Sequence, residues 1–147
     1  MRKLQLLLLI IIISQGSFTA QSIRNFKEKN DGNAKERTQM LDLLRNNLKN
    51  DIEQDVVFVV NHFLVSENYA WMEGDVQRKD GLKLKLPYDG MECCHVEALF
   101  KKVKGTWILK REGAFSTDVW YECLGNDFPD ADPRIYSKAN RSHIICH

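Results

Sequence analysis

Apolar residues recur at helical spacing over residues 34–52, and polar or charged residues separate them. This pattern predicts one amphipathic helix with a single buried face. Asn33, with Glu36 three positions later, has the form of an N-cap and its capping-box partner. We therefore expect the helix to begin at Ala34 and to pack against a sheet. The apolar positions are Met40, Leu41, Leu44, Leu48 and Ile52.

Four segments after this helix have the composition of β-strands. Residues 56–65 are β-branched and aromatic on both faces, which predicts a central strand covered on both sides. Residues 69–77 alternate between two faces and form a hairpin with the first strand. Residues 96–103 and 106–112 form a second hairpin. A long polar connection over residues 78–91 separates the two hairpins.

The element order is a helix, two hairpins and a short helix over residues 116–124, which Gly125 would end. This order predicts an α+β fold in which the N-terminal helix packs on a four-stranded antiparallel meander. A single domain would span residues 33–136. We expect residues 21–32 to be a flexible lead-in and residues 137–147 to be a polar tail.

The N-terminus is typical of a secretory signal peptide. Positive charge in residues 1–3 precedes an apolar run over residues 4–13, which is far shorter than the ~20 residues of a membrane-spanning helix. Ala20 suits the position before the cut, and Gly16 is the alternative. An uncleaved N-terminal anchor is the other alternative. We expect a signal peptide over residues 1–20 and a secreted or periplasmic protein without a stable membrane span after processing.

The charge balance argues against a nucleic-acid partner. The chain has 21 basic and 20 acidic residues and a formal net charge of +1. Removing residues 1–20 takes away Arg2 and Lys3 and leaves a net charge of −1. A near-neutral protein lacks the basic excess that binds phosphate backbones or anionic membranes.

Export makes disulfide bonds the default state of the four cysteines. Cys94 comes just before the third predicted strand, and Cys123 follows the fourth, so both lie near the same end of the second hairpin. Cys93 would point to the opposite face. We therefore expect a Cys94–Cys123 disulfide, with Cys93 and Cys146 left as a tail-anchoring pair or as free thiols.

Thiols and imidazoles also suggest a metal site as an alternative to disulfides. Zinc and copper prefer these ligands, and the candidates are Cys94, His95, Cys146 and His147. The cysteines show no Cys-x-x-Cys spacing, so we favour disulfides and expect no cofactor.

Three acidic residues are the weak catalytic candidates. Glu73 and Asp75 share one face of their strand, and paired carboxylates can perform acid–base chemistry when their environments differ. Asp118 lies in a turn between a strand and a helix, where functional residues are common. A solvated strand edge and a first-turn helix carboxylate are the alternative roles. His62 is expected to be a hydrogen-bonded core residue.

Residues 37–136 resemble a group of small uncharacterised exported bacterial proteins. The resemblance is carried by an aromatic-Ala-aromatic strand, a Gly-x-Trp turn and a Gly-x-x-x-Thr-Asp-Val-Trp segment. It implies an exported one-domain protein with a cystatin-like or nuclear-transport-factor-2-like arrangement, and it implies no activity. The matching segments are Phe58-Val59-Val60, Tyr69-Ala70-Trp71-Met72, Gln77-Arg78, Ala98-Leu99-Phe100-Lys101-Lys102, Gly105-Thr106-Trp107 and Gly113-Ala114-Phe115-Ser116-Thr117-Asp118-Val119-Trp120.

These observations favour an exported binding or interaction module that recognises a protein or small-molecule ligand in the cell envelope. A small hydrolase that uses the acidic candidates is the alternative, and a Cys/His metal-binding protein is a third hypothesis. No coherent catalytic constellation is visible in the sequence, so an enzyme is the less favoured class.

We predict that the exported protein begins at Gln21, because the charged start and the short apolar run are removed together. Mass spectrometry of the protein recovered from the envelope or the medium checks the new N-terminus. An intact Met1 on the exported protein would contradict the prediction.

Overall fold

The computed structural model describes residues 22–86 and 88–146, so the expected signal peptide and His147 lie outside the described residues. The chain forms a five-stranded antiparallel sheet in the order β1-β2-β3-β4-β5. This confirms the α+β class and adds one strand to the expected four. The elements are β1 (Arg24–Asn25), α1 (Ala34–Ile52), β2 (Val56–Val65), β3 (Tyr69–Arg78), β4 (His95–Val103), β5 (Thr106–Ala114), α2 (Leu124–Asp127), the 3-10 helix η1 (Pro133–Ile135) and α3 (Arg141–Ile144).

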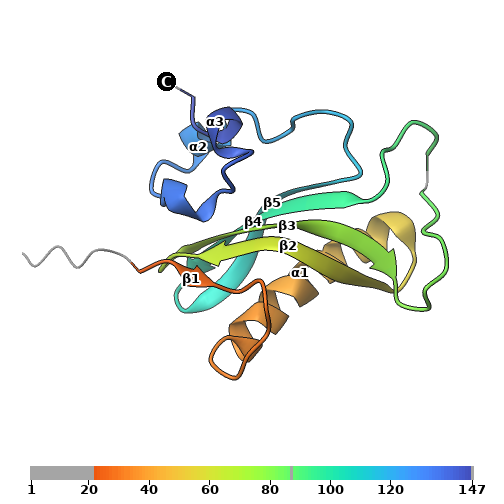
Figure 1. The fold of residues 1–147 in the computed structure, drawn as a ribbon, viewed down its shortest axis with the longest axis horizontal. Coiled ribbons are helices and arrows are strands. Elements are labelled where there is room, and N and C mark those ends of the chain that lie inside the picture. Colours follow the sequence, from red (N-terminus) through yellow and green to blue (C-terminus); the bar gives the residue numbers. More distant parts are fainter. Residues whose placement is uncertain (1–21, 87, 147) are drawn as a thin grey trace, which may run out of the picture.

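The sheet lies between two layers, one formed by an N-terminal helix and one formed by the C-terminal segment (Figure 1). Helix α1 packs on one face, and the C-terminal segment with α2 and α3 packs on the other. The described part of the chain contains no helix that is long and apolar enough to cross a membrane.

Helix α1 has the predicted bounds and the predicted buried face. Its start differs from the expected capping box, because the Asn33 side chain makes no cap hydrogen bond to the helix. Asn33 Oδ1 instead accepts a hydrogen bond from the Asn30 amide at 2.9 Å, and Nδ2 donates to the Glu28 carbonyl at 2.9 Å. Asn33 therefore shapes the preceding loop.

Glu36 ties the first turn of α1 to three strands. Trp107 Nε1 on β5 donates to Oε2 at 2.7 Å, Lys102 Nζ on β4 lies 3.1 Å from the same oxygen, and Arg24 on β1 lies 3.3 Å from Oε1. Burial opposes the charge of this carboxyl, but hydrogen bonds from these three residues outweigh it and lower the pKa of Glu36 to about 2.

Strand β2 is not the central strand that its two apolar faces predicted. It lies next to the short β1, and Val57 and Val59 are 38% and 43% exposed. A β-bulge between Val60 and His62 shifts the register against β3. Since a bulge adds one residue, it reverses which residues face α1. The bulge therefore brings Phe63 and Val65 to the same face as Val56, while the apolar Val57, Val59 and Leu64 lie on the other face.

Strand β3 contributes buried residues to both faces of the sheet. Ala70, Met72 and Val76 belong to the core under α1, as the predicted alternation requires. Tyr69 and Trp71 belong to a second core on the opposite face. The Trp71 ring packs against Trp120, Tyr121 and Tyr136, with ring centroids 6.0, 6.0 and 5.4 Å away.

The expected helix over residues 116–124 is wrong. The segment forms turns, and α2 begins at Leu124, where the helix was expected to end. Gly125 does not stop the helix but allows it to approach α3, because a side chain at this position would lie 2.9 Å from the Ile144 carbonyl oxygen.

The segments expected to be a flexible lead-in and a polar tail contribute residues to the folded body. Within residues 22–32, β1 pairs with β2, and Phe26 is buried in the core under α1. Within residues 137–146, α3 buries Ile144 in the second core.

The disulfide pairing differs from the expected Cys94–Cys123 bond. Cys123 pairs with Cys146, and their Cα atoms are 5.1 Å apart. The Cys123 amide donates to the His143 carbonyl at 2.8 Å, so α3 lies directly beside Cys123 on the sheet face away from α1. Cys94 is instead joined to Cys93.

We predict that Leu44→Ala destabilises the protein by about 2–5 kcal/mol, because Leu44 has no exposed surface and its removal leaves a cavity. Val57→Ala is the matched control and should cost less than ~0.5 kcal/mol, since this side chain is partly exposed and lies outside the core. Chemical denaturation measures both free energies. Equal small effects would contradict the packing of α1 on the sheet.

We predict that Glu36→Gln destabilises the protein by about 1–2 kcal/mol at pH 7, after allowance for partial exposure of the site. The folded-state pKa of Glu36 is about 2 against 4.5 in the unfolded chain. Its contribution is therefore present above pH 4.5 and is lost as the pH falls toward 2. Denaturation at a series of pH values should show the two proteins converging below pH 4.5. A constant difference across that range would contradict the assignment.

Candidate functional site

The structure brings two carboxylates together on the sheet face away from α1. Glu73 on β3 and Glu97 on β4 are direct cross-strand partners. Trp71 Nε1 donates to Glu73 Oε1 at 2.6 Å, and Trp120 Nε1 donates to Glu97 Oε2 at 3.1 Å. Like charges on directly opposite residues of neighbouring strands repel each other and destabilise the sheet. The hydrogen bonds from the two indole groups offset part of this destabilisation.

Burial raises the pKa of Glu97, and the charge of Glu73 raises it further, against the hydrogen bond from Trp120. Burial also raises the pKa of the neighbouring Tyr121, with the charges of Glu97 and Glu73 acting in the same direction. A carboxyl whose pKa is raised beside a second carboxyl is an arrangement that can perform acid–base chemistry.

The other predicted residues of this face have ordinary partners. Asp75 accepts a hydrogen bond from Asn61 Nδ2 at 2.9 Å and lies opposite His95 in the register. His62 lies opposite Glu73, and its Nε2 is 2.7 Å from the Ile135 carbonyl, which confirms a hydrogen-bonded histidine. Glu73 and Asp75 therefore share a face as predicted.

Asp118 stands apart from this pair. It is exposed in the turn before α2, where its amide donates a hydrogen bond to Ser116 Oγ at 3.1 Å. Because the expected helix does not form here, Asp118 does not serve as a first-turn helix carboxylate.

The proposed metal ligands are divided among separate structures. Cys94 and Cys146 belong to different disulfides, and His147 lies outside the described residues. No group of three or more His, Cys, Asp or Glu side chains is arranged to hold a metal within residues 22–86 and 88–146.

A pocket of about 330 Å³ opens on the other face, between the C-terminal half of α1 and the end of β5. Its floor is apolar, and two carboxylates reach its wall. The size and mixed lining match the low end of small-molecule sites. The lining residues are Leu48, Asn50, Asp51, Ile52, Tyr88, Met91, Glu112, Ala114 and Phe115.

A β-bulge places Glu112 in this pocket. The register of β4 against β5 shifts between Leu99 and Phe100, which leaves Lys110 as an extra residue on β5. Leu109 packs against the core under α1. In a regular strand, residues an odd number of positions apart point to opposite faces, so without the bulge Glu112 would point away from α1. With it, Glu112 lies opposite Ala98 and reaches α1, where Asn47 Nδ2 donates to Oε1 at 3.1 Å.

The Glu112 carboxylate is half-buried and has no cationic partner in the pocket lining. The Ala114 amide donates to Oε2 at 3.0 Å. Burial raises the pKa of Glu112, and the charge of Asp51 raises it further, although the hydrogen bonds from Ala114 and Asn47 oppose the shift.

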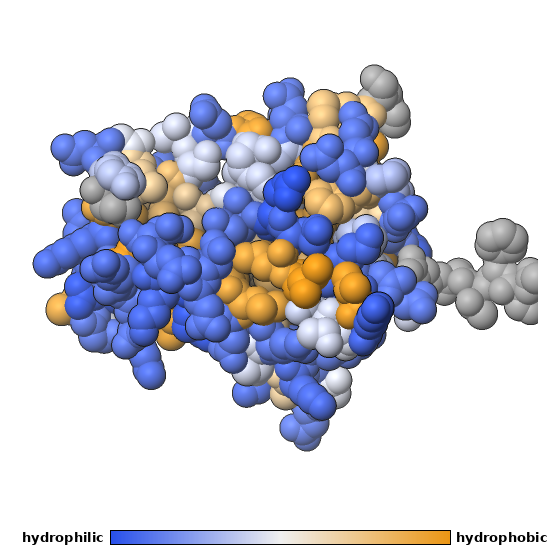
Figure 2. Space-filling model, turned by 180° about the vertical axis from the view of Figure 1, so that it is seen from behind, coloured by the Kyte–Doolittle hydropathy of each residue, from blue (hydrophilic) through white to orange (hydrophobic). Residues whose placement is uncertain are grey.

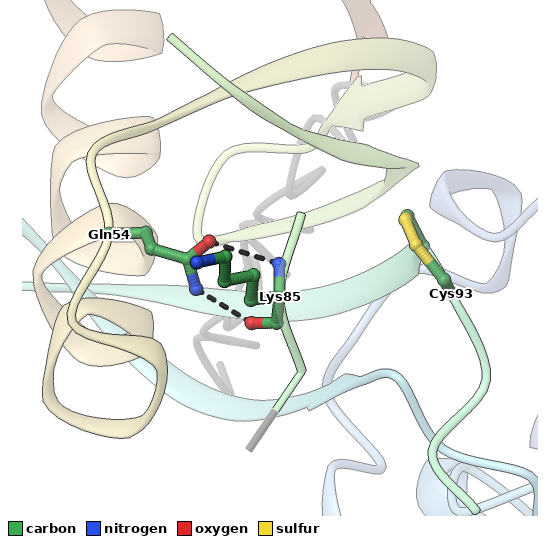
Figure 3. Close-up of a disulfide and its surroundings, with 4 residues drawn as sticks. Gln54, Lys85 and Cys93 are labelled. Atoms are coloured by element: carbon green, nitrogen blue, oxygen red, sulfur yellow. Dashed lines mark hydrogen bonds between the residues drawn. A yellow bond between two sulfur atoms is a disulfide. The ribbon is translucent and has the colours of Figure 1, made fainter. Parts of the chain in front are cut away.

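The loop between β3 and β4 forms the outer wall of the pocket and is held at several points. The Gln54 side chain donates to the Lys85 carbonyl at 2.6 Å and accepts from the Lys85 amide at 3.0 Å (Figure 3). Leu84 is buried, and the Glu92 amide donates to the Phe115 carbonyl at 3.0 Å. Cys93 and Cys94 form a disulfide at the end of this loop, just before β4 (Figure 3).

The remaining surface offers weaker candidates. Figure 2 shows a face that is mainly hydrophilic and is interrupted by a compact apolar patch. The exposed large apolar residues come from several elements, and single exposed apolar residues are normal on soluble proteins. A second cavity beside Asp55 and Arg78 is lined only by polar residues, and a third beside Tyr69 is rich in lysine.

Sequence reasoning identified Glu73 and Asp75 but missed Glu97 and Glu112. Glu97 follows the same alternation as Glu73, so the paired strands were a signal for it. Nothing in the alternation of β5 indicated Glu112, because the bulge that turns it inward leaves no local sequence mark.

No family model matches the chain, and neither a curated protein nor a solved structure shows significant similarity to it.

Proposed function

We propose that the protein is an exported binding module that takes a small organic ligand in the pocket between α1 and β5. The observation that carries this proposal is a cavity of about 330 Å³ that has an apolar floor and the half-buried carboxylate of Glu112 in its wall. Apolar walls provide affinity, and a few polar groups orient the ligand.

The anchored walls support a binding role. Leu48, Ile52 and Phe115 belong to the main core, so the floor is part of the rigid body of the protein. The hydrogen bonds from Gln54 hold the outer loop against α1. A preformed pocket needs little ordering on binding, which favours affinity.

Export is part of the proposal. The signal-peptide pattern of residues 1–20 supports secretion or a periplasmic location, and disulfide-bonded cysteines are typical of such compartments. The ligand would therefore be met outside the cytoplasm.

An acid–base hydrolase at Glu73 and Glu97 is the second candidate. The specific observation in its favour is the raised pKa of Glu97 beside a second carboxylate. In this reading, Glu97 would donate a proton and Glu73 would accept one, while Asp75 and Asp118 would take no direct part. We rank it second because none of the pockets described above includes this pair.

Methyl NMR spectra of the mature protein test the binding proposal. We expect small aromatic amines or alcohols to shift the methyl signals of Leu48, Ile52 and Met91, with Kd on the order of 1 mM for such small probes. Ala114→Leu should fill the pocket and abolish these shifts.

Thr106→Leu is the control, because it adds the same side chain at the exposed opposite end of β5. If a panel of small aromatic and aliphatic amines, alcohols and acids leaves the three methyl signals unchanged, the binding proposal is wrong. Shifts that persist in a folded Ala114→Leu protein would also count against this pocket.

A further inference from the structure

We propose that the pocket between α1 and β5 selects a ligand with an ammonium group on a short apolar body. This inference rests on the proposed binding function and adds the charge of the ligand. Three sources of negative potential meet in the pocket: Glu112, Asp51 and the C-terminal end of α1. No Lys, Arg or His side chain is among the described residues that line it.

Glu112 has unused acceptor capacity. Each carboxylate oxygen has about two acceptor positions. Oε1 accepts one hydrogen bond from Asn47, and Oε2 accepts one from the Ala114 amide. An ammonium group carries three donors and can bind such an oxygen through a charge-assisted hydrogen bond.

The end of α1 adds to the negative potential. Asn50, Asp51 and Ile52 line the pocket and belong to the last turn of this helix. The C-terminus of a helix carries partial negative charge and attracts cations. Lys49, the basic residue of this turn, lies 3.6 Å from Asp55 and does not line the pocket.

A second carboxylate, Glu36, lies at the opposite end of the interface between α1 and β5, and the protein neutralises its charge. Glu36 accepts a hydrogen bond from Trp107 and forms ion pairs with Lys102 and Arg24. Glu112 receives only the neutral donors of Asn47 and Ala114. A cationic group of a ligand could therefore pair with Glu112, as Lys102 and Arg24 pair with Glu36.

The lining also sets the body of the ligand. Leu48, Ile52 and Phe115 are nearly fully buried, and Met91 and Tyr88 form the outer side. A cavity of about 330 Å³ with such walls suits an aryl or alkyl group of modest size. A strongly hydrated polyamine or a bare metal ion would leave these apolar walls unused.

The test compares phenethylamine, phenethyl alcohol and phenylacetate by titration of the mature protein, read from the methyl signals of Leu48, Ile52 and Met91. We expect the amine to bind at least about tenfold more tightly than the alcohol, and the acid to bind most weakly. Glu112→Gln should remove the preference for the amine while the affinity for the alcohol stays the same. Unchanged alcohol binding shows that the variant pocket is intact.

Glu122→Gln is the matched control, because it removes an exposed carboxylate elsewhere and should leave all three affinities unchanged. Equal binding of amine and alcohol to the wild-type protein would overturn the charge inference and leave the binding function standing. An amine preference that persists in Glu112→Gln would overturn the role of Glu112. Absence of binding by all three probes and by the wider panel would overturn the proposed function itself.

Discussion

Burial of β3 on both faces is the constraint on which the rest of the structure depends. Ala70 and Met72 face α1, while Tyr69 and Trp71 face the other way, and all four are almost fully buried. A single helix covers only one face of a sheet, so the indole of Trp71 requires a second layer. The C-terminal segment provides that layer, and the Cys123–Cys146 disulfide links the two ends of this segment. The indole of Trp120 lies over Gly113, where any side chain would collide with it.

Two β-bulges explain where sequence reasoning succeeded and where it failed. The periodicity of α1 and the alternation of β3 follow from local geometry, so the sequence predicts their bounds and their buried faces. The bulges in β2 and β5 reverse the alternation within a strand, and each depends on pairing with its neighbour. Simple alternation therefore misplaces Phe63 and Val65 in β2, and it does not identify Glu112 as a pocket residue.

The C-terminal half depended on long-range contacts that the sequence does not display. Composition alone made residues 137–147 look like a solvated tail, because Ile144 and Ile145 stand among polar residues. The burial of Ile144 and the disulfide at Cys146 can be predicted only once it is known that a second layer packs on the other face of the sheet. The preference for Cys94 over Cys146 as the partner of Cys123 failed for the same reason, because it considered one hairpin and not the layer above it.

The interface between α1 and β5 contains two carboxylates in opposite electrostatic circumstances. The pKa of Glu36 is held far below its usual value, so ionisation of Glu36 stabilises the fold. The pKa of Glu112 is raised, so the folded state holds the proton more tightly than the unfolded chain, and ionisation of Glu112 costs stability as the pH rises through that value. A cation bound beside Glu112 would lower this pKa again and so stabilise the folded protein by mass action. A bound cation would then stabilise the ionised form of Glu112, as Arg24 and Lys102 stabilise the ionised form of Glu36 at the other end of the interface.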